Sequence, residues 1–66
     1  MSEPKLTPRQ LEALRLIAEG MRDKQIAAQM NITPQGIGNW VMVICRVLDA
    51  KTRSHAVAIA VRRGLV

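Results

Sequence analysis

The stretch "DKQIAAQMNITPQGIGNWVMVICRVL", residues 23–48, predicts two helices joined by a turn of only a few residues. The first helix should run from about Asp23 to Met30. Its apolar side chains share one face, which we expect to be the inner side: Ile26, Ala27 and Met30. Asn31 suits the left-handed conformation of such a turn, and the side chain of Ile32 is expected to be buried in the turn. Two helices linked this closely predict a helix-turn-helix.

The second of these helices begins after Thr33, a good N-cap, and has Pro34 at its first position. It should continue to about Leu48. At about 100° per residue, one narrow arc forms the core stripe: Ile37, Val41, Ile44 and Leu48. The side opposite the core carries a different set: Gln35, Asn39, Met42 and Arg46. A further, largely apolar stripe lies beside the core stripe: Gly36, Trp40, Val43 and Val47.

A helix is expected before this pair, within "LTPRQLEALRLIAEG", residues 6–20. Thr7 serves as its N-cap and Gln10 completes a capping box, with Leu6 placed as a hydrophobic staple. Gly20 ends the helix. Its inner face should carry four side chains: Leu11, Leu14, Ile17 and Ala18.

A fourth helix should follow the pair, capped by Thr52 and closed by Gly64. Its core side is expected to consist of Ala56, Val57, Ala60 and Val61. This leaves Ile59 exposed, and we interpret His55 as a solvated surface residue. The sequence therefore predicts an all-α, four-helix bundle. Residues 1–5 form a short polar lead, and residues 6–66 form one helix-turn-helix domain.

The composition fits one small domain with a polyanionic partner. The chain has 66 residues, 48% of them hydrophobic, so a packed core is expected although Phe and Tyr are absent. Ten Lys or Arg residues against five Asp or Glu residues give a net charge of +5, which is typical of binding to nucleic acid. A lone cysteine, no recognisable signal peptide and no membrane span predict a cytoplasmic protein. No catalytic or metal-ligating pattern is present, so we expect no enzyme, metal or cofactor.

Two segments together resemble the LuxR/GerE-type DNA-binding domain of bacterial transcription regulators: "LTPRQLEALRLIAEGMRDKQIAAQMNIT" and "AKTRSHAVAIAVRRGLV". The resemblance runs from Leu6 to Val66. It implies that the third helix enters the major groove of DNA and that the fourth forms a homodimer contact. It also implies that three residues approach phosphates: Lys24, Lys51 and Arg53.

The third helix departs from that family at the positions that would read DNA. The family typically has Thr-Val-Lys at residues 36–38, His at Trp40, Asn at Val43 and Lys at Val47. This chain keeps an apolar residue at position 37 and loses the usual polar groups. Gly36 and Gly38 weaken the start of the helix; they either permit a close approach by phosphates or another helix, or have no role.

The remaining side chains of this helix still offer contacts to double-stranded DNA. Gln35 and Asn39 lie one turn apart and can each pair with adenine, and Arg46 can reach a phosphate. Met42 and Val43 can meet thymine methyl groups, which favours A·T base pairs. Arg9, at the start of the first helix, is a further candidate for a phosphate contact.

The leading hypothesis is a DNA-binding transcription regulator that acts as a homodimer. The surface of the fourth helix expected to pair with a second chain consists of Ala58, Ile59 and Arg62. The Met1 start and the Gly-Leu-Val ending favour a protein that acts on its own.

The alternative is a protein-interaction module that keeps the fold and has lost base recognition. Its partner surface would be the apolar side of the third helix: Trp40, Met42, Val43 and Val47. Such a module could antagonise a related regulator by forming an inactive mixed dimer. Trp and Met are enriched at the centres of protein interfaces, from which charged groups are depleted.

Overall fold

The computed structural model describes residues 5–66, so the polar lead expected over residues 1–5 lies, apart from Lys5, outside the described residues. It contains four helices: α1 (Pro8–Ala18), α2 (Asp23–Met30), α3 (Pro34–Leu48) and α4 (Arg53–Arg62). No strand occurs between residues 5 and 66. The predicted all-α, four-helix fold is confirmed.

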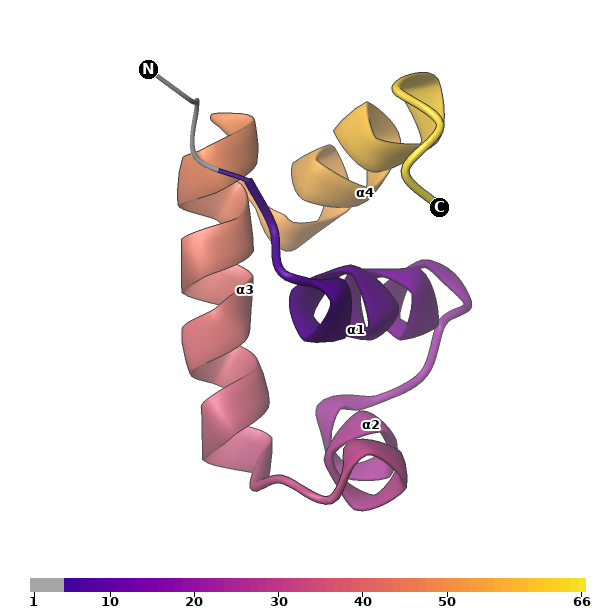
Figure 1. Cartoon of the computed structure of the whole chain (residues 1–66), viewed down its shortest axis with the longest axis vertical. Helices are drawn as coiled ribbons and strands as arrows, with labels where there is room; N and C mark the ends of the chain where they lie inside the picture. The colour runs from indigo at the N-terminus through magenta and orange to yellow at the C-terminus, as the bar shows by residue number, and fades with distance from the viewer. Residues whose placement is uncertain (1–4) are drawn as a thin grey trace.

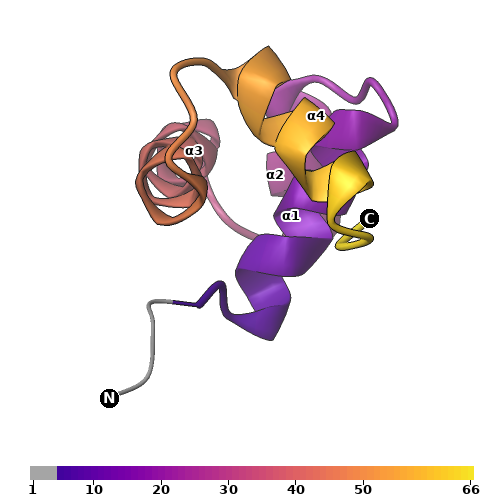
Figure 2. The ribbon, with the colours of Figure 1, turned by 90° about the horizontal axis from the view of Figure 1, so that it is seen from above.

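The longest helix, α3, packs against each of the other three. It stands along one side of the molecule, with α2, α1 and α4 stacked beside it from its N-terminal to its C-terminal end (Figure 1). Seen from above, α3 is viewed end-on, and α1 and α4 lie together on one side of it (Figure 2). One long side of α3 is therefore left uncovered by the other helices.

Local hydrogen bonds start the helices where the sequence predicts. The Thr7 hydroxyl accepts a hydrogen bond from the Gln10 N–H at 3.1 Å, and the Gln10 side chain accepts one from the Thr7 N–H at 2.9 Å, which confirms the capping box. The Thr33 and Thr52 hydroxyls cap α3 and α4. Each accepts a hydrogen bond at 3.0 Å from the backbone N–H three residues further on. These bonds satisfy N–H groups that the first helical turn leaves without partners.

Two apolar clusters form the core, and α3 contributes to both. The first contains Ala13, Leu16, Ile26, Ala27, Met30 and Ile37. The second contains Leu14, Ile44, Leu48, Ala56 and Ala60. Of the predicted core stripe of α3, Val41 is half-buried against the first cluster and the other three residues are buried. The rotation of α3 about its own axis is thus fixed at both of its ends.

The inner face predicted for α1 was partly wrong. Ala18 is exposed, whereas Ala13 and Leu16 are buried. The reason is that α1 packs between the two clusters, with Leu16 in the first and Leu14 in the second. A helix covered on two sides does not follow a single apolar stripe.

The orientation predicted for α4 was also partly wrong. Val61 was expected in the core and is 61% exposed. Ile59 was expected on the surface and is half-buried against the second cluster. The line through Ala56 and Ala60 is the centre of the buried face, so at about 100° per residue Ile59 lies at its edge and Val61 well outside it.

His55 is not the freely solvated side chain that the sequence predicted. It is half-buried, and its Nδ1 atom accepts a hydrogen bond from the Lys51 backbone N–H at 3.0 Å. His55 occupies the third position of α4, where a capping box usually places Glu or Gln. The imidazole instead bonds the N–H of Lys51, the residue before the N-cap, and so fixes the chain that leads into α4.

Candidate nucleic-acid interface

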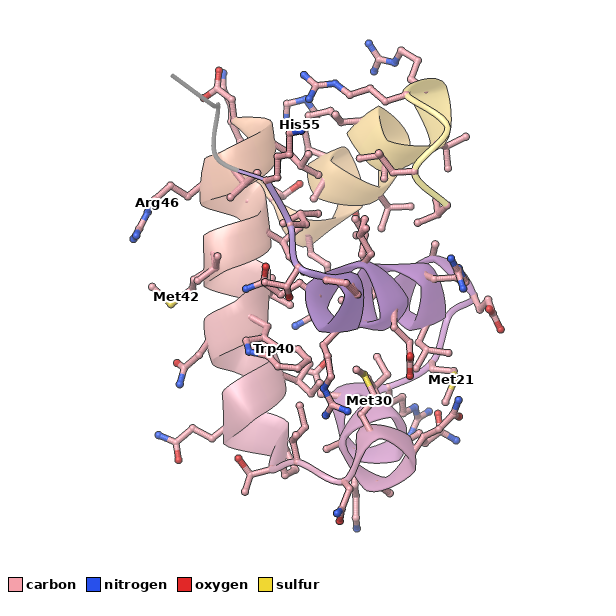
Figure 3. The ribbon with its side chains drawn as sticks, viewed as in Figure 1. Met21, Met30, Trp40, Met42, Arg46 and His55 are labelled. Carbon is pink, nitrogen blue, oxygen red and sulfur yellow. The ribbon has the colours of Figure 1, made fainter. Side chains whose placement is uncertain are left out.

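The uncovered side of α3 presents five exposed residues, which we call the outward face: Gln35, Asn39, Met42, Val43 and Arg46. Met42 and Arg46 point away from the other helices (Figure 3). The exposed fraction is 63% for Met42 and 36% for Val43. The four residues predicted to lie opposite the core are all exposed, and Val43 lies at the edge of their surface.

The outward face carries no negative charge. Arg46 is the one charged residue between positions 34 and 48, and the nearest acid along the chain is Asp49, directly after the helix. A polyanion approaching the face would therefore meet uncharged side chains and one guanidinium, with no carboxylate to repel it. This electrostatic character is compatible with a phosphate backbone on either side of the helix.

Arg53, predicted to contact phosphate, forms an ion pair with Asp23. Its Nη1 and Nη2 atoms donate hydrogen bonds to the two carboxylate oxygens of Asp23, the Nη2–Oδ2 distance being 3.0 Å. The hydrogen bond from Arg53 lowers the pKa of Asp23, and the same bond raises the pKa of Arg53. The pair joins the start of α2 to the start of α4 and holds both side chains partly out of water.

Two other predicted phosphate ligands lie close in the chain to the members of this ion pair. Lys24 follows Asp23 directly in α2, and Lys51 precedes Arg53 by two residues. Both lysines are exposed. Arg46 is not part of this group, because it lies on the outward face in the last turns of α3.

Arg9, also considered for a phosphate contact, is instead bound within the protein. Its Nη2 atom donates a hydrogen bond to the carbonyl oxygen of Met30 at 2.8 Å, at the end of α2. Its guanidinium carbon lies 5.8 Å from the centroid of the Trp40 ring. A cation–π contact of this kind contributes about 0.5–1 kcal/mol. Arg9 thus connects α1, α2 and α3, a role that its outward position in the sequence pattern did not indicate.

The side chains of the alternative partner surface do not form one exposed patch. Trp40 points from α3 toward α1 and α2, and packs against the first core cluster (Figure 3). Val47 is half-buried and lines a groove with Leu6 and other residues near both ends of the described chain. Met42 lies about 160° around the helix from Trp40. Met42 and Val43 alone remain as exposed apolar groups on α3.

The two glycines of α3 differ in what surrounds them. A Cβ atom at Gly36 would lie 3.2 Å from the Thr33 hydroxyl oxygen, the atom that caps the helix, so glycine suits the capping geometry. A Cβ atom at Gly38 would have no neighbour within 4 Å. Glycine inside a helix is less stable than alanine by about 0.5–1 kcal/mol. No contact among the described residues explains Gly38.

The described residues show no other kind of site. Between positions 5 and 66 there is no group of three or more His, Cys, Asp or Glu side chains able to hold a metal ion. Cys45 is a free, half-buried thiol beside the second core cluster. No helix in this range has the length and apolar character needed to cross a bilayer.

Comparison with known proteins relates the chain to bacterial regulators. The family model described as "Bacterial regulatory proteins, luxR family" matches residues 4–60. The HTH-type transcriptional regulator AlkS of Pseudomonas putida is 36% identical over 61 residues, covering 92% of this chain and 7% of AlkS. The transcriptional regulatory protein DesR of Bacillus subtilis (strain 168) is 32% identical over 59 residues, covering 89% of this chain and 30% of DesR.

A third relative is the uncharacterized transcriptional regulatory protein YxjL of Bacillus subtilis (strain 168). It is 33% identical over 66 residues, covering all of this chain and 30% of YxjL. The chain spans less than a third of the length of each of these relatives.

We predict that Trp40→Ala destabilises the fold. The half-buried indole contacts the first core cluster and the Arg9 guanidinium, so its loss should lower the free energy of unfolding by about 1.5–3 kcal/mol. Urea titration followed by circular dichroism measures this. Met42→Ala serves as the control, because Met42 is largely exposed and should change stability by no more than about 0.5 kcal/mol. Equal stability of Trp40→Ala and the wild type would show that the indole is not a structural group.

We predict that the Asp23–Arg53 pair makes stability depend on pH in the acid range. Because Arg53 lowers the pKa of Asp23 below 3.8, the pair stabilises the fold fully above that value. The stabilisation is lost as the pH falls through the folded-state pKa. Asp23→Asn should therefore lower the free energy of unfolding by about 0.2–1 kcal/mol at neutral pH and by progressively less in acid.

Urea titrations between about pH 2 and pH 7 test the ion pair. Arg53→Gln, which removes the guanidinium, should remove the same pH-dependent component, and the double variant should add little to either single variant. Parallel stability curves for the wild type and Asp23→Asn would mean that the pair does not form in solution.

Proposed function

Because the chain belongs to the LuxR family of bacterial regulatory proteins, we propose that it binds duplex DNA and regulates transcription, with the outward face of α3 in the major groove. The observation that carries this proposal is the uncovered, acid-free side of the helix. Its 15 residues extend for about 22 Å. The major groove is about 12 Å wide and admits an α-helix.

Phosphate contacts would position the helix in the groove. We assign them to Lys24 and Lys51 at the junction of α2 and α4, to Arg46 near the end of α3, and to Arg53. The ion pair with Asp23 gives Arg53 a structural task as well, so its substitution would affect both fold and binding. Lys51 is the better probe, because it is exposed and its recorded hydrogen bond is made by its backbone.

The proposal includes a homodimer formed through α4. The surface expected for it, made of Ala58, Ile59 and Arg62, includes the exposed Ala58 and Arg62 and the outer part of Ile59. Val61 is 61% exposed, but at about 100° per residue it lies about 160° around α4 from Ile59, so it is not part of this surface. Small side chains along the helix allow a second copy to approach closely. Two-fold pairing would place the two half-sites about 34 Å apart.

We predict salt-dependent binding to DNA that weakens when Lys51 is replaced. The logarithm of the binding constant should fall linearly with the logarithm of the salt concentration. Lys51→Gln should reduce the slope of this line by about one unit, and it should weaken binding by a similar factor on duplexes of unrelated sequence. Fluorescence anisotropy with labelled 20-base-pair duplexes between 50 and 200 mM salt measures both values. Arg15→Gln, which removes an exposed charge from α1, is the matched control and should leave the slope unchanged.

The proposed function is overturned if no duplex binds at 50 mM salt. It is also overturned if Arg15→Gln changes the slope and Lys51→Gln does not, because DNA would then bind a different face.

We predict that a charge in the middle of the α4 surface prevents dimerisation. Ala58→Glu places a carboxylate on an exposed site, so the fold should survive while dimer dissociation becomes at least about tenfold more favourable. Sedimentation velocity over a range of protein concentrations measures this. Gln29→Glu, which adds the same charge on the exposed side of α2, should dimerise like the wild type. Unchanged dimerisation of Ala58→Glu would place the contact elsewhere.

A further inference from the structure

The outward face has side chains suited to one kind of base pair. It combines two amides, Gln35 and Asn39, with two exposed apolar groups, Met42 and Val43. We propose that this face reads A·T base pairs, with Met42 and Val43 contacting the C5-methyl groups of thymine and the two amides pairing with adenine. The inference rests on the proposed function and names the class of DNA that the same site recognises.

The spacing of these residues fits successive base pairs. Gln35, Asn39 and Met42 fall within an arc of about 60° around α3, and Val43 borders that arc. From Gln35 to Val43 the helix rises about 12 Å, which corresponds to three or four base pairs at about 3.4 Å each. The four side chains can therefore meet the edges of neighbouring base pairs in one groove.

The exposed apolar groups specify thymine among the four bases. Met42 is 63% exposed, so most of its side chain faces solvent. In the major groove the thymine methyl group is the apolar feature that a methionine or valine side chain can bury, whereas guanine presents two acceptors that favour Arg or Lys. Arg46 is the one such residue of α3, and it lies in the last turns. Arg46 is the thirteenth of the 15 residues of α3, one turn beyond Met42, and we assign it to the DNA backbone.

Gly38 would permit a close approach of DNA at the border of this face. It lies one turn before Met42, at the border of the outward face, and a Cβ atom there would meet nothing within 4 Å. The fold would thus accept alanine, which favours the helix. Glycine leaves room there for the DNA backbone or a base edge to approach α3 closely.

The experiment compares thymine with deoxyuridine, which lacks only the C5-methyl group. A pool of random 20-base-pair duplexes is first selected on the wild-type protein. Each selected sequence is then synthesised with thymine or with deoxyuridine throughout. We expect A·T-rich sequences and an affinity for the thymine duplex that is about three- to tenfold higher, because each buried methyl group adds favourable apolar contact.

Variants connect this difference to the named side chains. Met42→Ala and Val43→Ala should each reduce the ratio of thymine to deoxyuridine affinity toward one, without loss of fold because both residues are exposed. Val66→Ala is the matched control for Val43→Ala, since Val66 is 37% exposed but lies outside α3, and it should retain the ratio. Gly38→Ala should raise the Tm and weaken binding to the thymine duplex.

The outcomes separate this inference from the proposed function. Equal affinity for the two duplexes, or selection of G·C-rich sequences, would overturn the A·T assignment while DNA binding itself stands. A ratio that survives both Met42→Ala and Val43→Ala would also overturn it. Absence of any duplex binding at 50 mM salt would instead overturn the proposed function.

Discussion

The packing of α3 into both core clusters is the constraint on which the rest of the structure depends. Ile37 anchors its first half among α1 and α2, and Ile44 and Leu48 anchor its second half against α1 and α4. Because the anchors lie on one stripe, rotating α3 by one residue would turn each of them about 100° out of the core. The side opposite the stripe is therefore fixed as the surface that α3 offers to other molecules.

Polar contacts at the edges of the core then set the positions of the shorter helices. Arg9 bonds the end of α2 and covers the indole of Trp40, while Asp23 pairs with Arg53 across the starts of α2 and α4. In both cases a guanidinium that composition alone would assign to DNA is used to hold helices together. The count of ten Lys and Arg residues thus overstates the number of cations available to phosphates. Among the predicted phosphate ligands, Lys24, Lys51 and Arg46 are those whose side chains make no hydrogen bond or ion pair with any described residue of the protein.

The helix bounds and caps were predictable from the sequence because their causes are local. Thr7 with Gln10, Thr33 with Pro34, and Asn31 in its turn each act within a few residues. The errors arose where the burial of a residue depends on contacts between helices. Ala18 and Val61 have the apolar character of core residues, yet the way α1 and α4 cross α3 leaves them exposed.

The candidate site was predictable to a similar extent. Periodicity alone identified the exposed side of α3. The hydrogen bond of Arg9, its cation–π contact with Trp40 and the ion pair of Arg53 each join residues that are 21 or more positions apart, and they left no local signal.

The central claim, that the outward face of α3 enters the major groove, is tested most directly by methyl NMR of the protein bound to a duplex. Specifically ¹³C-labelled methyl groups of Met42, Val43, Val61 and Val66 report separately on the outward face of α3, on α4 and on the C-terminal end. Addition of DNA should shift the signals of Met42 and Val43 and give intermolecular contacts with major-groove protons. Shifts at Val61 and Val66 with none at Met42 and Val43 would contradict the claim.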